Sequence, residues 1–174
     1  FFATAMGEVN MSAIIISLNT KTGVLEYTNA SHDPAMLFLP KIANHTSALP
    51  PDQSKKADYI LLDEVHGKRL GTLKDTAYEK AQLEIKNGSL IFIYTDGLLE
   101  ICNSSGRPFN DRMIIKACNE LNIEPKTSLT HAQSDFHQKL MQFSGGLINL
   151  KDDLSYFFVR YQKQDPTQRS SYAS

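Results

Sequence analysis

The chain has 174 residues, 41% of them hydrophobic and 21% charged, and its formal net charge is −1. This composition supports one globular domain and excludes a disordered chain, while the nearly neutral charge gives no footprint for nucleic acid or an anionic membrane. No apolar stretch approaches the roughly 20 residues that span a bilayer, and Cys102 and Cys118 form no disulfide framework or zinc spacing, which favours a cytoplasmic protein with free thiols.

The first part of the chain predicts three antiparallel strands followed by a loop. Residues 11–18 are rich in β-branched side chains, and residues 24–29 follow them after a five-residue polar loop that ends in Gly23. This arrangement is typical of a hairpin. Residues 35–39 form a third apolar run, and the polar, proline-containing segment 40–57 predicts a loop.

The middle of the chain predicts a short strand at 59–62, a glycine-dependent turn at 66–71 and a second hairpin. Residues 81–85 alternate between apolar and polar side chains, whereas 89–95 are almost entirely apolar. The Lys86-Asn87-Gly88 segment between them predicts the hairpin turn. Because 89–95 is apolar on both faces, we expect a central strand that ends at Asp96.

The last part of the chain predicts two amphipathic helices and a closing strand. One helix follows Asn110, a plausible N-cap, and the other carries apolar residues between 129 and 143 and ends at Gly145-Gly146. Residues 154–161 predict a last strand, apolar on both faces and therefore central and covered. The pattern indicates an α+β fold over residues 1–161, with 162–174 as a polar tail.

Two aspartate sites adjoin the most apolar strands of this prediction. Asp96 follows one strand, and Asp152 and Asp153 precede the other. A carboxylate at the end of a buried strand leaves the core at a fixed place, and oxygen ligands without His or Cys favour Mg²⁺ or Mn²⁺ over zinc. Each site taken singly is also an ordinary turn or solvated strand start, so context must decide.

Four motifs occur in order along the chain: Gly-Val-Leu-Glu-Tyr-Thr-Asn-Ala-Ser-His-Asp-Pro at 23–34, Leu-Gly at 70–71, Tyr-Thr-Asp-Gly-Leu-Leu-Glu at 94–100 and Asp-Asp-Leu-Ser at 152–155. Together they resemble bacterial PP2C-like serine/threonine phosphatases of the SpoIIE and RsbU type. The resemblance covers about residues 11–161. It implies the family's αββα sandwich of antiparallel sheets with flanking helices, here N-terminally incomplete.

The resemblance also implies a two-metal phosphoprotein phosphatase. Asp96 and Asp152 would hold Mn²⁺ or Mg²⁺, and Asp153 would orient the metal ligands or cap the turn, with a one-residue ambiguity between the two neighbours. The implied substrate is phosphoserine or phosphothreonine on a STAS-type anti-anti-sigma protein in partner-switching signalling. An upstream sensor module is implied as well, and a homodimer is compatible with the sequence.

Two departures from the family pattern affect these expectations. Ser31 replaces the glycine of the family's Ala-Gly-His, from which we predict an ordinary backbone angle there and a structural, hydrogen-bonded role for His32. The family's N-terminal D-x-x-G-H-G motif has no match, and the chain opens at Phe1 without a methionine. We therefore expect a fragment, inactive alone, of a parent that could be membrane-anchored through an upstream region.

The remaining charged groups and rival functions leave alternatives open. Lys68 and Arg69 could touch a phosphoprotein partner or form a solvated turn, and His131 and His137 lie on different sides of their predicted helix. A non-catalytic partner-binding or ligand-sensing module could use the same fold. A PAS-like or GAF-like sensory domain would require no carboxylates at these strand ends, so distant Asp96 and Asp152 would favour it.

Overall fold

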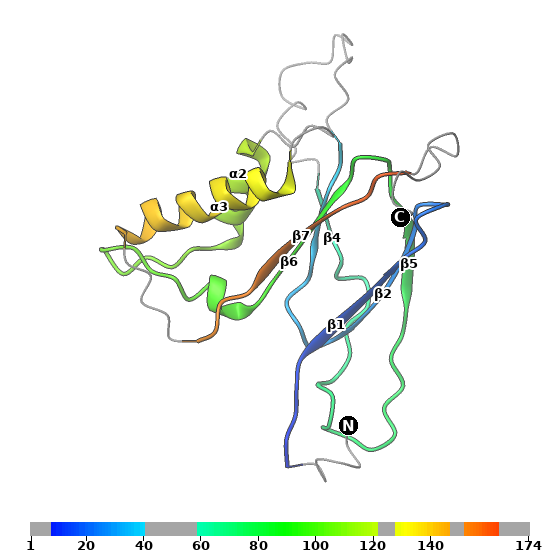
Figure 1. Cartoon of the computed structure of the whole chain (residues 1–174). Helices are drawn as coiled ribbons and strands as arrows, with labels where there is room; N and C mark the ends of the chain where they lie inside the picture. The colour runs from blue at the N-terminus through cyan, green and yellow to red at the C-terminus, as the bar shows by residue number, and fades with distance from the viewer. Residues whose placement is uncertain (1–7, 41–58, 122–127, 147–151, 164–174) are drawn as a thin grey trace, which may run out of the picture.

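The computed structural model describes residues 8–40, 59–121, 128–146 and 152–163. These residues form two antiparallel sheets and two α-helices, with both helices on the same side of one sheet (Figure 1). The α+β sandwich expected from the sequence is confirmed. Most of the predicted loop at 40–57 lies outside the described residues.

The two sheets have different strand orders and together use every strand of the described chain. The first sheet has the order β1-β2-β5 and the second β4-β3-β6-β7. The strands are β1 (Ala13–Leu18), β2 (Val24–Ala30), β3 (Met36–Phe38), β4 (Tyr59–Leu61), β5 (Ala81–Glu84), β6 (Leu90–Tyr94) and β7 (Tyr156–Arg160). All pairings are antiparallel.

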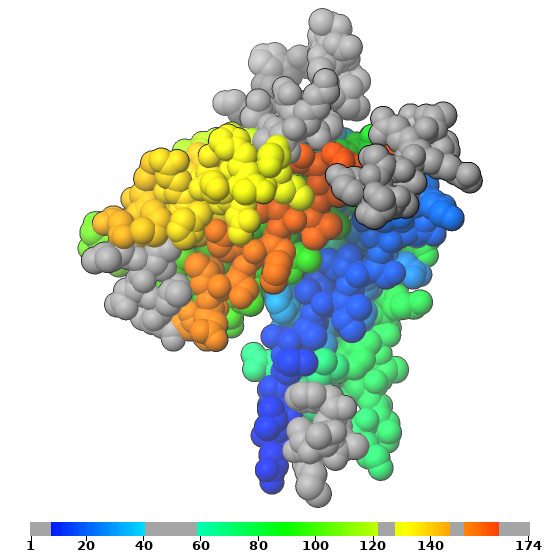
Figure 2. Space-filling model, in the orientation of Figure 1, coloured from blue at the N-terminus to red at the C-terminus, as the bar shows by residue number. Residues whose placement is uncertain are grey.

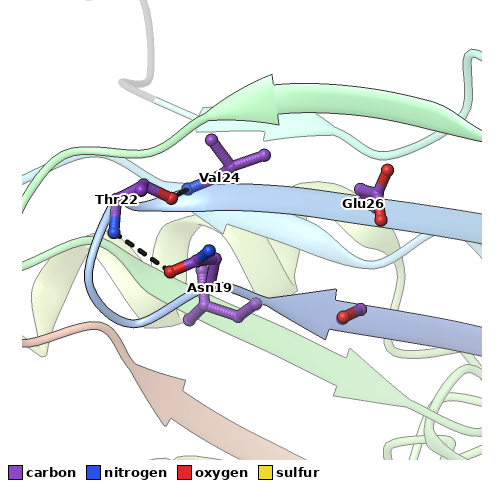
Figure 3. Close-up of a pocket in the computed structure, with 6 residues that line it drawn as sticks. Asn19, Thr22, Val24 and Glu26 are labelled. Atoms are coloured by element: carbon purple, nitrogen blue, oxygen red, sulfur yellow. Dashed lines mark hydrogen bonds between the residues drawn. The ribbon is translucent and has the colours of Figure 1, made fainter.

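The predicted first hairpin is confirmed and joins β1 to β2. In its loop the Asn19 Oδ1 accepts a hydrogen bond from the Thr22 N–H at 3.2 Å, and the Thr22 Oγ1 accepts one from the Val24 N–H at 3.3 Å (Figure 3). Gly23 has a φ of +81°, and a Cβ there would lie 2.8 Å from the Ile85 carbonyl oxygen. Both the backbone angle and the available space therefore require glycine at the end of this loop.

The predicted second hairpin is wrong. β5 pairs with β2 in the first sheet, whereas β6 pairs with β3 and β7 in the second, so the Lys86-Asn87-Gly88 turn carries the chain between sheets. The local turn signal is still real, because Gly88 has a φ of +90° and the Ser89 N–H donates to the Lys86 carbonyl at 3.0 Å. The two strands separate because alternating β5 suits a sheet with a solvent-facing side, whereas doubly apolar β6 requires cover on both faces.

β6 lies at the centre of the molecule, as predicted. Leu90, Phe92 and Tyr94 contribute to the core under the helices, while Ile91 and Ile93 pack in the core shared with the first sheet. Alternate side chains of one strand thus bury into two different cores, which explains why this run is apolar throughout.

The two predicted helices are present with their predicted ends. In α2 (Asp111–Glu120) the Asn110 side chain accepts a hydrogen bond from the Met113 N–H at 3.2 Å, which confirms the N-cap. α3 (Leu129–Ser144) ends at Gly145, whose φ of +79° is typical of a left-handed C-cap. Neither of these helices is long and apolar enough to cross a membrane, nor is any other in the described ranges.

The predicted central position of the last strand is wrong for the described sheet, in which β7 forms an edge beside β6. Tyr156 and Phe158 pack against the core under the helices, but Phe157 and Val159 are 59% and 42% exposed. These two apolar side chains lie on the opposite face of β7, where the described strands leave them open to solvent. The apolar pattern of β7 alone could not distinguish a covered strand from an exposed edge.

Two phenylalanines on the paired strands provide a matched test of this packing. We expect Phe92→Ala to lower the free energy of unfolding by about 3–5 kcal/mol, because Phe92 is fully buried and contacts the rings of Phe136 and Phe158. Phe157→Ala should cost less than about 1 kcal/mol, since its ring is 59% exposed. Urea denaturation measures both; equal losses would contradict the assigned faces of β6 and β7.

Candidate metal centre

The two predicted aspartate sites lie side by side, although 56 residues separate Asp96 from Asp152 in the sequence. The Thr95 N–H donates to the Ser155 carbonyl at 2.9 Å, and the Thr95 hydroxyl donates to the Asp153 carbonyl at 3.0 Å. The Ser155 N–H in turn donates to the Thr95 hydroxyl oxygen at 3.0 Å. These hydrogen bonds join the segment after β6 to the segment before β7.

The glycine of the Asp-Gly pair is required by this close approach. A Cβ on Gly97 would lie 2.4 Å from the Asp153 carbonyl oxygen and 3.3 Å from that of Asp152. Real Cβ atoms essentially never come within 3.0 Å of a neighbour, so any side chain here would separate the two segments. The Asp-Gly pair is therefore more than a generic turn.

The two carboxylates are oriented by backbone groups of their own segments. Asp96 begins the short 3₁₀-helix η1 (Asp96–Leu98), and its Oδ1 accepts from the Gly97 N–H at 3.0 Å. The Asp152 Oδ1 accepts from the Asp153 N–H at 2.7 Å. Asp96, Asp152 and Asp153 are all exposed, so their carboxylates are accessible to a cation in solvent.

A cavity of about 220 Å³ lies beside Asp96. It is lined by polar and charged residues from four segments: Ser12, Ser31, His32, Asp33, Arg69, Thr95 and Asp96. Figure 2 shows the molecule hollowed between the orange segment that leads into β7 and the dark blue segment that leads into β1. The cavity thus combines one predicted aspartate with groups from the end of β2 and from the 66–71 turn.

His32 enters this cavity through a turn organised by Asn29. The Asn29 Oδ1 accepts from the His32 N–H at 2.8 Å, and the Asn29 amide donates to the His32 carbonyl at 2.9 Å. The His32 ring pairs through Nδ1 with the Asp33 carbonyl at 2.8 Å. These contacts agree with the predicted hydrogen-bonded role of His32, and they also place it in the same cavity as Asp96.

The prediction that Ser31 has an ordinary backbone angle is wrong. Its φ is +58°, the left-handed region that glycine adopts most easily. The Ser31 hydroxyl donates to the Gly67 carbonyl at 2.8 Å, a contact that glycine could not make. Serine therefore takes up a backbone angle that glycine adopts more easily, and its hydrogen bond offsets part of the strain.

The predicted site omitted two carboxylates, Asp33 and Asp111. Burial raises the pKa of the Asp33 carboxyl; His32 opposes this, while the negative charges of Asp96 and Asp111 add to it. The Tyr94 hydroxyl donates to the Asp111 Oδ1 at 3.3 Å, and burial raises the pKa of Tyr94 above its ordinary range. Negative charge therefore accumulates around the end of β6. The position of Asp111 in the first turn of a helix gave no signal of this, because acids are common there.

The carboxylate oxygens of the candidate site suit a hard cation, but they are few. Carboxylate oxygens are the ligands that Mg²⁺ and Mn²⁺ prefer, and Mg²⁺ often binds through one or two carboxylates plus water. Within the described ranges, no three His, Cys, Asp or Glu side chains are grouped closely enough to hold a metal ion by themselves. A metal at Asp96 and Asp152 would therefore complete its coordination with water or further ligands.

The two histidines of α3 contact residues outside the candidate metal centre. His131 faces Asp135 at 3.4 Å within α3, and the His137 Nδ1 lies 3.4 Å from the Tyr156 hydroxyl. Cys118 is buried and Cys102 is exposed, and both are free. These residues give no reason to extend the site.

Several solved structures share this fold. The SiaA-PP2C domain of Pseudomonas aeruginosa has a TM-score of 0.64 at 15% identity, over 88% of this chain and 53% of that one. The RsbU and RsbW domains of a Mycobacterium tuberculosis protein give 0.62 at 19% identity, over 89% and 37%. The manganese-presoaked SpoIIE phosphatase domain of Bacillus subtilis gives 0.52 at 11% identity, over 89% and 58%. The fold is PP2C-like, and the chain spans between about a third and three fifths of these structures.

The family follows from the sequence itself. The family model described as Stage II sporulation protein E (SpoIIE) matches residues 3–162. The chain belongs to the SpoIIE family. No curated protein matches it. The resemblance inferred from the four ordered motifs is confirmed.

Paired variants at Ser31 test whether its hydrogen bond offsets the backbone strain. We expect Ser31→Ala to lower the free energy of unfolding by about 1 kcal/mol, because it removes the bond to Gly67 and keeps the left-handed angle. Ser31→Gly should cost less, since glycine loses the bond but relieves a strain of about 1–2 kcal/mol. Thermal or urea unfolding measures both, and a larger loss for glycine than for alanine would contradict this account.

Proposed function

We propose that the chain forms part of a metal-dependent phosphatase domain that hydrolyses phosphoserine or phosphothreonine on a protein. The observation that carries this proposal is the convergence of the Asp96 and Asp152 segments at one end of the β6–β7 pair, on a PP2C-like fold. The side-by-side placement removes the argument for a PAS-like or GAF-like domain. Because the chain spans only part of the similar structures, the full activity is proposed for a protein that contains this chain.

Asp96 and Asp152 are the residues that would hold Mn²⁺ or Mg²⁺. When bound, the cations would supply an activated water and neutralise the phosphate under attack. Asp153 has a different role in this proposal: its N–H orients the Asp152 carboxylate and its carbonyl accepts from Thr95. Asp33 adds negative charge beside Asp96 and would strengthen attraction for the cation.

The partner proposed for this site is a phosphorylated STAS-type protein in partner-switching signalling, regulated through an upstream sensor module in a cytoplasmic domain. RsbU and SiaA domains are among the similar structures, which supports a regulatory partner of this kind. A homodimer belongs to the same proposal. Full-length protein that binds the phosphoprotein but does not hydrolyse it with Mn²⁺ would favour the non-catalytic binding module instead.

Single substitutions of the three aspartates test the assigned ligands. In the full-length protein we expect Asp96→Asn and Asp152→Asn each to lower Mn²⁺-dependent hydrolysis by more than about a hundredfold, because each removes a ligand. Asp153→Asn should lower it by about tenfold or less, because it keeps the backbone N–H and carbonyl that contact Asp152 and Thr95 and removes only a nearby negative charge. Phosphopeptide hydrolysis and Mn²⁺ titration calorimetry measure these effects. If Asp153→Asn weakens Mn²⁺ binding more than Asp152→Asn, the ligand is Asp153.

The two proposed ligands, Asp96 and Asp152, also lead to a prediction about the activity of the 174-residue chain by itself. We expect little or no hydrolysis of p-nitrophenyl phosphate with saturating Mn²⁺, because two carboxylates do not hold a dinuclear centre firmly. The full-length protein under the same conditions is the control. Hydrolysis by the isolated chain at the rate of the full-length protein would refute this expectation.

A further inference from the structure

We propose that Arg69 binds the phosphoryl group of the substrate in the cavity that also contains Asp96. The ligand class is a phosphate monoester dianion on a protein side chain, so the inference rests on the proposed function and assigns it a substrate-binding residue. The sequence left Arg69 open between a partner contact and a solvated turn. The cavity favours the partner contact, because Arg69 lines it together with Asp96 and His32.

The Arg69 guanidinium is not neutralised by the acids around it. Asp33 and Asp96 line the same cavity, yet in the described part of the chain Arg69 forms no ion pair within 4.0 Å. The Arg69 Nη1 donates a long hydrogen bond of 3.5 Å to the Asn10 Oδ1. Most of its five N–H donors therefore remain available for an anion.

The backbone on both sides of Arg69 is held in place. Leu70 exchanges two hydrogen bonds with Met11, its N–H donating at 2.9 Å and its carbonyl accepting at 3.0 Å. On the other side, the Gly67 N–H donates to the Asn29 carbonyl at 2.7 Å, and the Tyr78 hydroxyl donates to the Lys68 carbonyl at 3.0 Å. A fixed backbone lowers the cost of presenting the guanidinium to a ligand.

The neighbouring lysine is placed differently. Lys68 lines a separate hollow with His66, Thr76 and Glu79 and does not line the cavity with Asp96. Two adjacent cations of one turn thus face two different environments. Lys68 is therefore a matched control for the charge of the turn.

The chemistry of a phosphate monoester matches this arrangement. Cations held by Asp96 would neutralise one side of the phosphoryl group, and a planar guanidinium can bind two oxygens on another side through a bidentate contact. Arg69 and the carboxylates would then separate across a bound phosphate instead of pairing with each other. Arg69 acts here in substrate binding and takes no part in bond making.

The test uses the full-length protein with Mn²⁺ and the variants Arg69→Ala, Arg69→Lys and Lys68→Ala. We expect Arg69→Ala to raise the KM for a phosphopeptide about ten- to a hundredfold with a smaller change in kcat, because a charge-assisted hydrogen bond to the substrate is lost. Arg69→Lys should recover part of the loss, since lysine is a point charge without the planar fork. Lys68→Ala should match the unchanged protein.

Calorimetric binding of inorganic phosphate to the Mn²⁺-loaded protein separates this role from a purely structural one. Arg69→Ala should weaken phosphate binding by the same factor as it raises KM. If Arg69 only neutralised Asp33 and Asp96, its removal would tighten Mn²⁺ binding and leave phosphate binding unchanged, which would overturn the inference. If Arg69→Ala fails to fold by circular dichroism, Arg69→Gln replaces it, with the same two outcomes.

The same measurement separates this inference from the proposed function. Phosphate binding that depends on Arg69 in a protein that hydrolyses no phosphopeptide would support the inference while refuting the phosphatase. Hydrolysis with phosphate binding that is indifferent to Arg69 would support the phosphatase and overturn the inference.

Discussion

The hydrogen bonds of Thr95 with residues 153–155 hold the candidate site together. They extend the antiparallel β6–β7 pairing by one step beyond Tyr94 and Tyr156, and both aspartate sites adjoin them. The position of Asp152 relative to Asp96 is therefore a consequence of sheet register. A slip of one residue would move β7 by about 3.3 Å and turn each of its side chains to the opposite face.

The register is itself fixed by the aromatic core under the helices. Phe92 of β6 stands opposite Phe158 of β7, with ring centroids 4.9 Å apart, and the Phe136 ring of α3 lies 5.1 Å from Phe92. Shifting β7 by one residue would replace the partly buried Phe158 with the exposed Phe157. Packing at the middle of the strands thus determines where the carboxylates at their ends lie.

Local features of the fold could be predicted from the sequence, whereas strand partners could not. The loop ending at Gly23, the cap at Asn110 and the doubly buried strand before Asp96 each depend on a few adjacent residues, and all are confirmed. The Asn87-Gly88 turn was correctly located but wrongly taken for a hairpin, because a turn does not specify which sheet the next strand joins.

The candidate site, like the strand partners, could be predicted only where it depends on adjacent residues. The ordered motifs indicated Asp96 and Asp152 as candidates, whereas the surroundings of Asp33 and Asp111 and the left-handed angle of Ser31 depend on contacts between distant segments. Ser31 shows this most clearly, since its stabilising partner, Gly67, is 36 residues away. No local pattern around Ser31 could indicate that a serine there keeps a glycine-like backbone.

The clustering of acids around Asp33 has an energetic cost in the folded chain. Asp33 lies near Asp96 and Asp111 in a partly buried position, and its pKa is raised chiefly by burial, to which the negative charges of Asp96 and Asp111 add. That cost is present when all three carboxylates are ionised and falls as Asp33 becomes protonated. A bound divalent cation would reverse it, because the same carboxylates would then stabilise the ion. Under the proposed function, cation binding and folding would be coupled in this way.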